Sequence, residues 1–452
     1  MTKSLKNLWA RLLFRDRGIL PSSRLLGLFL VFSFAVTLVT ITGVSWMWVF
    51  IVNGLFLLLT FLDLLYAPKK QQLTFHRTIP MELERGNVYT VKVDIHNLST
   101  YAVKFKLLDG LPQSFQTALP LTGKVDRQAT LTTFYEITAP IRGKYEVQKL
   151  YVRYTSLLGL WEKQITVDMV DEVKVIPDLT DAKQYLESAQ QFLMYEGLKI
   201  RKQKSAEGEF SQIRNYVVGD DPRKINWRQT AKLQEIMTNE YEPEHGKYIT
   251  ILIDCGRMMG AELKKGNLLD KVLEAALTVT AAALKNGDYV AVLAFSRDVK
   301  VFVPPEKGMD HMQRILQAIY HLEVDASESN YPAVLNYLQT VQKKRSLVLL
   351  FSDVHTFLHE ESGLLYLKRL RRRHLFLMIG IENRDLLDKT KLEPNNVQTA
   401  MMKSIAQQQI QIKKREKANW ERQGLLMVEA TEERLATAAV SHYIHIMNQG
   451  LL

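Results

Sequence analysis

Two long apolar stretches dominate the pattern of hydrophobic and polar positions near the start of the chain. Residues 25–43 and 46–66 carry almost no charge. Each is roughly 20 residues long, enough for a helix to cross a hydrocarbon core of about 30 Å. The connector between them is so short that the two helices must be antiparallel neighbours. We therefore predict a transmembrane helical hairpin over residues 25–68.

Charge around this hairpin predicts its orientation. Six cations and a single carboxylate precede the first stretch within residues 1–24, and Lys69 and Lys70 follow the second. Positively charged flanks stay on the cytoplasmic side. We expect two spans in the cell membrane, with both termini and the soluble domains in the cytoplasm. Residues 1–24 form a basic amphipathic segment, either lying in the membrane interface or packed on the protein. Asp63 lies near the interface and is expected to reach water, or else to act as an intramembrane carboxylate.

The period of the pattern changes after the hairpin. Residues 70–178 contain short runs that alternate between apolar and polar positions, separated by turn signals and with no long helical period. This pattern is typical of an all-β sandwich. The candidate strands are residues 90–95, 103–107, 129–137, 145–154 and 173–176.

The remainder divides into two parts. Residues 179–247 are predicted to form a helical linker and a distinctive polar segment. Residues 248–452 alternate apolar strands with helices, which predicts an α/β doubly wound domain around a mostly parallel sheet. Ligands of such sheets bind beyond the carboxyl ends of the strands. Two predicted strands end there in carboxylates, at Asp254 and Asp353.

The polar segment from Gly208 to Lys232 combines dense charge with large aromatic side chains. Gly219 permits a tight turn, either Asp220 or Asp221 can cap a helix, and Pro222 suits a first helical position. We predict an ordered lariat and a short helix. Its charges form either an internal ion network or a docking surface beside the Asp254 loop, and both can hold. The candidate interaction surface comprises Arg214, Tyr216, Asp220, Asp221, Arg223, Asn226, Trp227 and Lys232.

These residues carry a family resemblance. The pattern that begins at Gly208, passes through Gly219-Asp220-Asp221 and ends at Lys232 resembles the bacterial family called domain of unknown function fifty-eight. Asn226 stands where that family commonly has Asp, and Lys232 where it often has Arg. The resemblance implies a C-terminal domain like the von Willebrand factor A domain. It also implies a protein partner of the MoxR class of AAA+ ATPases.

In a von Willebrand factor A domain, an Asp-x-Ser-x-Ser loop, a Thr and a later Asp hold a divalent cation. The corresponding loop here begins at Asp254, but Gly256 and Met258 replace the two serines. Ser329 occupies the Thr position and Asp353 supplies the last carboxylate. Because Mg²⁺ prefers six hard oxygen ligands, we expect a degenerate metal site of Asp254, Ser329 and Asp353 that binds Mg²⁺ weakly or not at all, and no other cofactor.

Composition narrows the function classes. A single cysteine excludes an internal disulfide framework and a cysteine-based zinc site. The net charge of +11 suits an anionic lipid bilayer. The chain lacks aromatic nucleic-acid platforms and the motifs of nucleotide or serine hydrolases, so we expect no nucleic-acid partner. The favoured function is a membrane-anchored, non-enzymatic protein-interaction adaptor. The alternatives are a metal-dependent, phosphoesterase-like hydrolase that uses Asp254 and Asp353, and an envelope-sensing scaffold.

Overall fold

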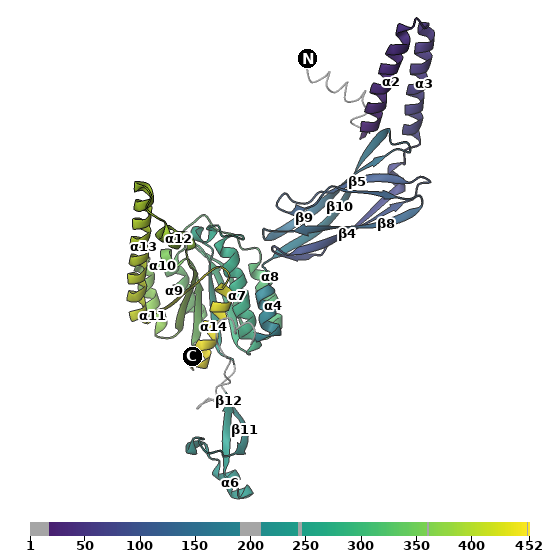
Figure 1. Ribbon diagram of the computed structural model, residues 1–452. Helices are drawn as coiled ribbons and strands as arrows, with labels where there is room; N and C mark the ends of the chain where they lie inside the picture. The colour runs from purple at the N-terminus through teal and green to yellow at the C-terminus, as the bar shows by residue number, and fades with distance from the viewer. Residues whose placement is uncertain (1–17, 190–208, 243–245, 359–360, 450) are drawn as a thin grey trace. The chain divides into compact units, whose positions relative to one another are not determined.

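The computed structural model describes residues 18–189, 209–242, 246–358, 361–449 and 451–452 (Figure 1). The chain divides into two compact units, Met1–Ile176 and Pro177–Leu452. Most of the predicted N-terminal amphipathic segment, residues 1–17, lies outside the described residues.

The first unit begins with two apolar helices, α2 (Ser23–Ile41) and α3 (Trp46–Leu65). Both are long and apolar enough to cross a membrane, and only 6% and 11% of their most hydrophobic windows is buried. Their apolar side chains therefore pack against almost nothing in the protein, as expected for a surface that lipid covers. The two predicted apolar helices are confirmed to within a few residues at each end. That they cross a membrane, and on which side the soluble domains lie, stays a prediction.

Residues after the hairpin, together with one short strand before it, form the predicted sandwich of two sheets. The first sheet has the order β1-β10-β9-β5-β7, with β3 paired to β10. The second has the order β2-β4-β8-β6. Strands of the first sheet are β1 (Ile19–Pro21), β3 (Glu82–Glu84), β5 (Val103–Asp109), β7 (Leu121–Val125), β9 (Gly143–Thr155) and β10 (Trp161–Ile176). Strands of the second are β2 (Leu73–Thr78), β4 (Val88–Asn97), β6 (Gln116–Thr117) and β8 (Ala129–Thr138).

A buried ion pair ties the two sheets together inside an otherwise apolar core. Arg77 of β2 bonds Asp109 of β5 at 2.5 Å, and both side chains are fully buried. Arg77 also donates to the carbonyl oxygens of Val147 and Met169. Tyr135 of β8 donates to the other oxygen of Asp109. Each charge in this core therefore has several partners, which a buried ion requires.

The hairpin is fastened to the sandwich by Asp63, near the end of α3. Its carboxylate is 3% exposed and accepts hydrogen bonds from Ser156 Oγ (2.5 Å), Leu158 N (2.8 Å) and Leu160 N (3.2 Å). The expectation that Asp63 reaches water was wrong, because the turn between β9 and β10 folds over it. Trp161 Nε1 donates to Thr60 O at 2.8 Å and adds a second link.

The second unit contains a six-stranded sheet of order β15-β14-β13-β16-β17-β18. Only β14 and β15 pair in antiparallel orientation, so the sheet is mostly parallel, as the sequence predicted. The strands are β13 (Tyr248–Asp254), β14 (Tyr289–Phe295), β15 (Val299–Glu306), β16 (Ser346–Phe351), β17 (Leu375–Ile381) and β18 (Leu426–Ala430). The helices are α4 (Thr180–Glu187), α7 (Leu268–Lys285), α8 (Met309–Ile319), α9 (Tyr331–Val341), α10 (Val354–Leu358), α11 (Glu361–Arg371), α12 (Arg384–Lys391), α13 (Val397–Arg422) and α14 (Leu435–Asn448).

Helices cover both faces of this sheet (Figure 1). On one face α7 packs against β13, β14 and α14. On the other face α9, α10 and α11 share an apolar core with the strands, and Trp420 near the end of α13 completes it.

Replacing Asp63 by Ala should detach the hairpin from the β9–β10 turn. Three donors would lose their acceptor, and leaving buried donors unpaired costs about 1–3 kcal/mol each. We expect the first unit to lose about 3 kcal/mol of unfolding free energy, measured by pulse proteolysis of the full chain in detergent. Asp168→Ala, at an exposed position of β10, should change it by less than about 0.5 kcal/mol. Equal loss in both variants would contradict the fastening role.

Candidate functional site

The signature segment forms an antiparallel hairpin that we call the arm, residues 209–242. Strand β11 (Glu209–Asn215) pairs with β12 (Met237–Glu242). Between them lie a short 3-10 helix, η3 (Pro222–Lys224), and helix α6 (Trp227–Leu233). The sequence predicted the short helix but neither strand. The segments that join the arm to the α/β sheet, residues 190–208 and 243–245, lie outside the described residues.

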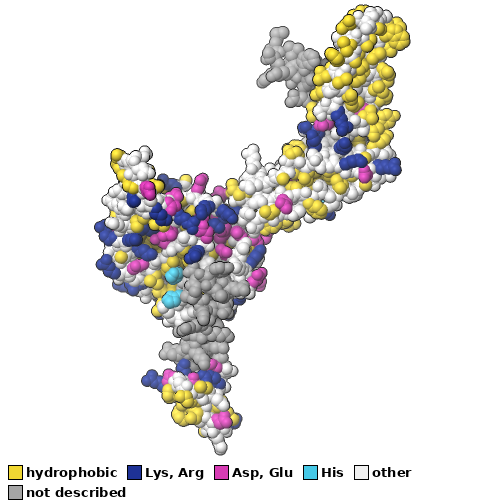
Figure 2. Space-filling model, viewed as in Figure 1, with side chains coloured by type: hydrophobic (Ala, Val, Ile, Leu, Met, Phe, Trp, Pro, Cys, Tyr) yellow, Lys and Arg dark blue, Asp and Glu magenta, His cyan; other side chains and the backbone are white. Residues whose placement is uncertain are grey.

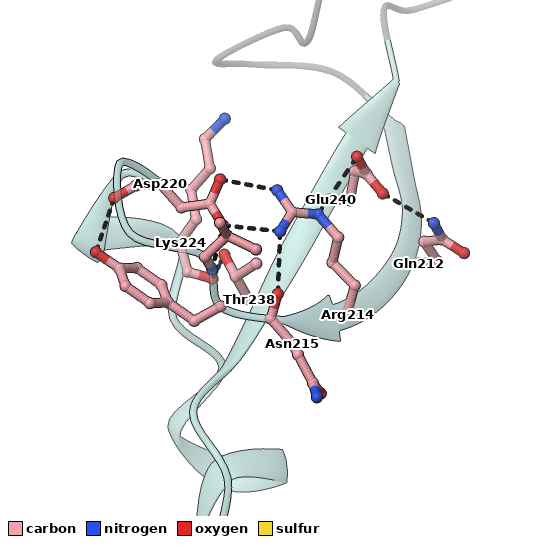
Figure 3. A network of polar contacts seen from close by, with 9 residues as sticks. Gln212, Arg214, Asn215, Asp220, Lys224, Thr238 and Glu240 are labelled. Carbon is pink, nitrogen blue, oxygen red and sulfur yellow. Dashed lines mark hydrogen bonds and ion pairs between the residues drawn. The ribbon is translucent and has the colours of Figure 1, made fainter.

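An ion network organises the arm around Arg214 (Figure 3). The guanidinium donates to both oxygens of Asp220 at 2.8 Å and lies 3.5 Å from Glu240. Asp220 in turn accepts from Val217 N at 2.9 Å, and its carbonyl accepts from Tyr216 OH at 3.1 Å. The hydrogen bond to Asp220 raises the pKa of Arg214. These contacts support the internal-network interpretation for Arg214, Tyr216 and Asp220.

Local capping explains the rest of the turn. Gly219 has φ +109°, a conformation that side chains disfavour. Asp221, and not Asp220, caps η3 by accepting from Arg223 N at 3.0 Å, with Pro222 at the first position. Asn226 caps α6 by accepting from Gln229 N at 3.1 Å, and its amide donates to Asn239 at 2.9 Å. An Asn at 226 can therefore serve both as cap and as donor to β12.

Apolar side chains of the arm remain uncovered. Trp227 is 69% exposed and Val218 is 97% exposed. Val217, Leu233 and Ile236 are also more than half exposed. Four cations and no carboxylate occur between residues 222 and 233. Of the predicted surface, the exposed residues are Asp221, Arg223, Trp227 and Lys232, whereas Arg214 and Asp220 are engaged with each other.

A second polar cluster lies at the carboxyl end of β13, around Asp254. The side chain is 2% exposed. Its Oδ1 accepts from Gly256 N (2.8 Å) and from Ser329 Oγ. Its Oδ2 accepts from Tyr331 OH (3.0 Å) and Ser352 Oγ (2.5 Å). An ionised carboxylate has about four lone-pair sites, so these four donors fill it. Burial raises the pKa of Asp254 and the hydrogen bonds oppose that rise.

The sheet register explains which residues meet Asp254. Ile253 pairs with Phe351 in parallel register, so the next residues, Asp254 and Ser352, share a face. Asp353 follows on the alternate side. There its Oδ2 accepts from Thr356 N (2.8 Å) and Thr356 Oγ1 (2.7 Å) in the first turn of α10. The structure thus brings Ser329 to Asp254, as predicted, and commits the carboxylate of Asp353 to Thr356.

Gly256 has a steric role in this cluster. A Cβ at that position would overlap Ser329 Oγ and would lie 3.2 Å from Asp254 Oδ1. The serine hydroxyl therefore occupies the space that a side chain at 256 would need. Met258, at the other replaced position, is 43% exposed. Among the described residues, no group of three or more His, Cys, Asp or Glu side chains is arranged to hold a metal ion.

Asp325 was missed by sequence reasoning. It accepts from Ser327 N (2.9 Å) and Ser296 Oγ (3.0 Å), and pairs with Lys300 at 2.6 Å. These contacts hold the pKa of Asp325 well below its usual range. The backbone N–H of Asp325 donates to Cys255 O at 2.7 Å. It therefore holds the loop of Ser329 against the loop of Asp254. A carboxylate in a polar loop, far from any strand end, gives no distinctive sequence signal.

Known proteins resemble this chain in part. The family model described as protein of unknown function DUF58 matches residues 212–424, which confirms the predicted family resemblance over that stretch. The uncharacterized protein YeaD of Bacillus subtilis (strain 168) is 24% identical over 200 residues, which are 44% of this chain and 48% of that protein. The match thus spans about half the length of that relative.

Two solved structures show weaker likeness. The conserved hypothetical protein BatB from Bacteroides thetaiotaomicron aligns over all of its own chain and 45% of this one, with 13% identity and a TM-score of 0.31. The ASH / PapD-like domain 7 of human CEP192 aligns over 88% of its own chain and 24% of this one, with 14% identity and a TM-score of 0.18.

The carboxylate of Asp254 already accepts hydrogen bonds from four donors, and we therefore predict weak metal binding. Because a cation would have to displace hydrogen-bond donors from Asp254, we expect calorimetric titration of the purified full chain with Mg²⁺ or Mn²⁺ to show no binding tighter than millimolar. Micromolar affinity that disappears in Asp254→Ala would contradict this expectation.

Asp254 also predicts a pH dependence of stability. Its pKa is raised in the folded state above the ordinary value of 3.8. As the pH rises from that value, the unfolded state loses the proton first, so this residue makes the free energy of unfolding fall with pH. Asp254→Asn removes the titration, and the hydroxyls of Tyr331 and Ser352 can accept from its amide. The free energy of unfolding is measured with denaturant at a series of pH values upward from 3.8. That of Asp254→Asn should increase relative to that of the wild type as the pH rises. If the difference in free energy of unfolding between Asp254→Asn and the wild type stays the same at every pH, the prediction is wrong.

Proposed function

We propose that this chain, whose residues 212–424 match the DUF58 family, is a membrane-anchored, non-enzymatic protein-interaction module. The arm is its docking surface and the helical hairpin is its anchor. The observation that carries the proposal is that Trp227, Val217 and Val218 are all left exposed on the arm. Large apolar side chains left in water usually mark a contact surface.

The partner should present an apolar pocket with an acidic rim. Trp and Arg side chains contribute most to binding when water is excluded around them. Trp227 is flanked by exposed Arg223, Arg228 and Lys232. Cations around an apolar centre favour a partner surface that carries carboxylates. A MoxR-class AAA+ ATPase, the partner class implied by the family resemblance, remains a hypothesis within this proposal.

The ion network supports docking indirectly. Arg214 holds Asp220 and Glu240, so the turn that carries Val217 and Val218 is fixed before a partner arrives. A preorganised loop loses less conformational entropy when it binds. On this interpretation the predicted surface has two parts. Arg214, Tyr216, Asp220, Asp221 and Asn226 shape the arm, while Trp227, Arg223 and Lys232 contact the partner.

The alternative of a metal-dependent hydrolase finds less support. Such an enzyme needs carboxylate oxygens turned toward a shared cation and a reacting water. Asp254 is filled by four donors, and Asp353 is bonded to Thr356. The remaining alternative, an envelope-sensing scaffold, shares the anchor and the arm, and it differs in requiring the hairpin for partner binding.

Replacing Trp227 by Ala should abolish partner binding without unfolding the arm. Because Trp227 is 69% exposed, its loss should change stability by less than about 0.5 kcal/mol. A photo-crosslinking amino acid at position 218 of the full chain, in its own membrane, should capture one defined protein. We expect capture to fall at least about tenfold in Trp227→Ala, as for a binding hot spot.

Phe134→Ala is the matched control, because Phe134 is an aromatic residue of the sandwich that is 58% exposed. It should leave capture unchanged. Unaltered capture in Trp227→Ala, or an equal loss in Phe134→Ala, would show that the arm is not the docking surface. Deleting residues 1–68 separates the adaptor from the envelope sensor, since an adaptor should still bind its partner in solution.

A further inference from the structure

A cavity of about 610 Å³ opens at the foot of α2 in the first unit. The first turn of α2, strands β5, β7 and β9, and the start of β10 contribute its walls. Five cations line it, and Glu162 is the one carboxylate among the lining residues. The cations are Arg24, Lys104, Lys106, Lys124 and Arg153. Figure 2 shows Lys and Arg side chains gathered on the sandwich directly below the apolar hairpin.

The register of the sheet places like charges opposite one another in this cavity. Lys104 of β5 faces Lys124 of β7, and Lys106 faces Arg153 of β9. Strand β5 alternates strictly, so both of its lysines stand on the outer face while Phe105 points into the core. Like charges directly opposite each other destabilise an antiparallel pair. Two such pairs side by side destabilise the sheet by electrostatic repulsion. An anion bound between the cations would remove that repulsion.

Carboxylates of the protein do little to offset these charges. Arg153 lies 3.9 Å from Glu162, at the limit of an ion pair. Lys124 pairs with Asp126 at 3.2 Å, but both side chains are more than half exposed, where such a pair is weak. No carboxylate of the described residues lies within 4.0 Å of the charged nitrogens of Lys104, Lys106 or Arg24.

The cavity is fixed in place at the start of a predicted span. Ser22 caps α2 by accepting from Leu25 N at 3.2 Å, and it donates to Gly159 O at 2.6 Å. Its backbone N–H donates to Leu160 O at 2.9 Å. The first turn of α2 is thereby bonded to the turn that also holds Asp63. From Leu25 onward the helix is apolar. In a bilayer that α2 enters from this end, the cavity would lie where the hydrocarbon layer begins, at the depth of the lipid phosphates.

We propose that this cavity binds the phosphate headgroup of an anionic phospholipid from the leaflet in which α2 begins. Lys104, Lys106 and Arg153 contact the phosphate, and Arg24 approaches it from the first turn of α2. The N-terminal end of this 19-residue helix adds a partial positive charge. The acyl chains run along exposed Leu26 and Leu30. The inference rests on the proposed insertion of the hairpin in a bilayer.

Native mass spectrometry of the full chain tests this assignment. The chain is reconstituted in nanodiscs with an equal mixture of phosphatidylglycerol and phosphatidylcholine and then released with its bound lipid. We expect the wild type to retain phosphatidylglycerol. Lys104→Gln with Lys106→Gln should reduce that retention at least about tenfold, since each cation near an anionic lipid surface contributes measurably to binding. Lys104→Arg with Lys106→Arg should restore it.

Lys144→Gln with Lys149→Gln is the control, with the same change in charge on β9 outside the cavity. It should bind lipid as the wild type does. Thermal unfolding in a neutral detergent separates loss of binding from loss of fold. Without the facing charges, Lys104→Gln with Lys106→Gln should unfold at the same temperature as the wild type or higher. Added phosphatidylglycerol should raise the unfolding temperature of the wild type and the control only.

Three results would overturn the assignment. One is equal retention of both lipids by the wild type. Another is an equal loss of phosphatidylglycerol in the control variant. The third is displacement of the lipid by an equal concentration of inorganic phosphate, which would make soluble phosphate the ligand. Carbonate extraction of membranes tests the membrane anchor of the proposed function separately from the lipid site. If carbonate removes the wild-type protein from the membrane, both the membrane anchor and the lipid site are refuted. If the protein stays in the membrane but retains the two lipids equally, only the lipid site is refuted.

Discussion

The first unit depends on the buried carboxylate of Asp63. A charge removed from water is stable only when donors of the protein replace the lost solvent, and here the β9–β10 turn supplies all three. The same turn provides the carbonyl groups that bind Ser22. Both helices of the hairpin are therefore held by one turn of the sandwich. The position of the cation-lined cavity, which that turn borders, follows from the same bonds.

The second unit uses buried charge in the same way. Asp254 lies where parallel sheets commonly bind ligands, yet its four donors come from three loops of its own domain. Its carboxylate joins those loops, as Asp325 does through Lys300 and Ser296. Charged residues that are saturated in this way stabilise a surface, and they are poorly suited to act on a ligand. The features still available for contact are exposed apolar groups and cations.

Sequence periodicity predicted the elements that bury a regular apolar face, and it failed for elements that bury only a few side chains. Most of the sandwich and the alternating strands and helices have a buried face, so their apolar residues recur regularly. The hairpin was predicted from the length of its two apolar runs instead. The arm is a two-stranded ribbon in which the buried residues among those described are Met237 and Thr238. Helix α13 buries only Ala406 and Trp420. At the Asp254 cluster the sequence placed Ser329 correctly. It could not distinguish Ser352 from Asp353, because a shift of one residue reverses the face of a strand.

The arm and the cavity resemble each other in composition while they differ in what they can recognise. At both, cations lie beside apolar surface: Trp227 and its neighbours on the arm, and α2 at the cavity. At the cavity the apolar component is a helix long enough to span a bilayer, so the matching ligand is amphipathic and lies in the membrane. At the arm it is a small patch on a preorganised turn, which suits a pocket on a folded protein. The two proposals therefore assign a lipid to the cavity and an acidic protein to the arm. In each case a hydrogen-bonded carboxylate, Asp63 at the turn beside the cavity and Asp220 in the arm, fixes the local backbone.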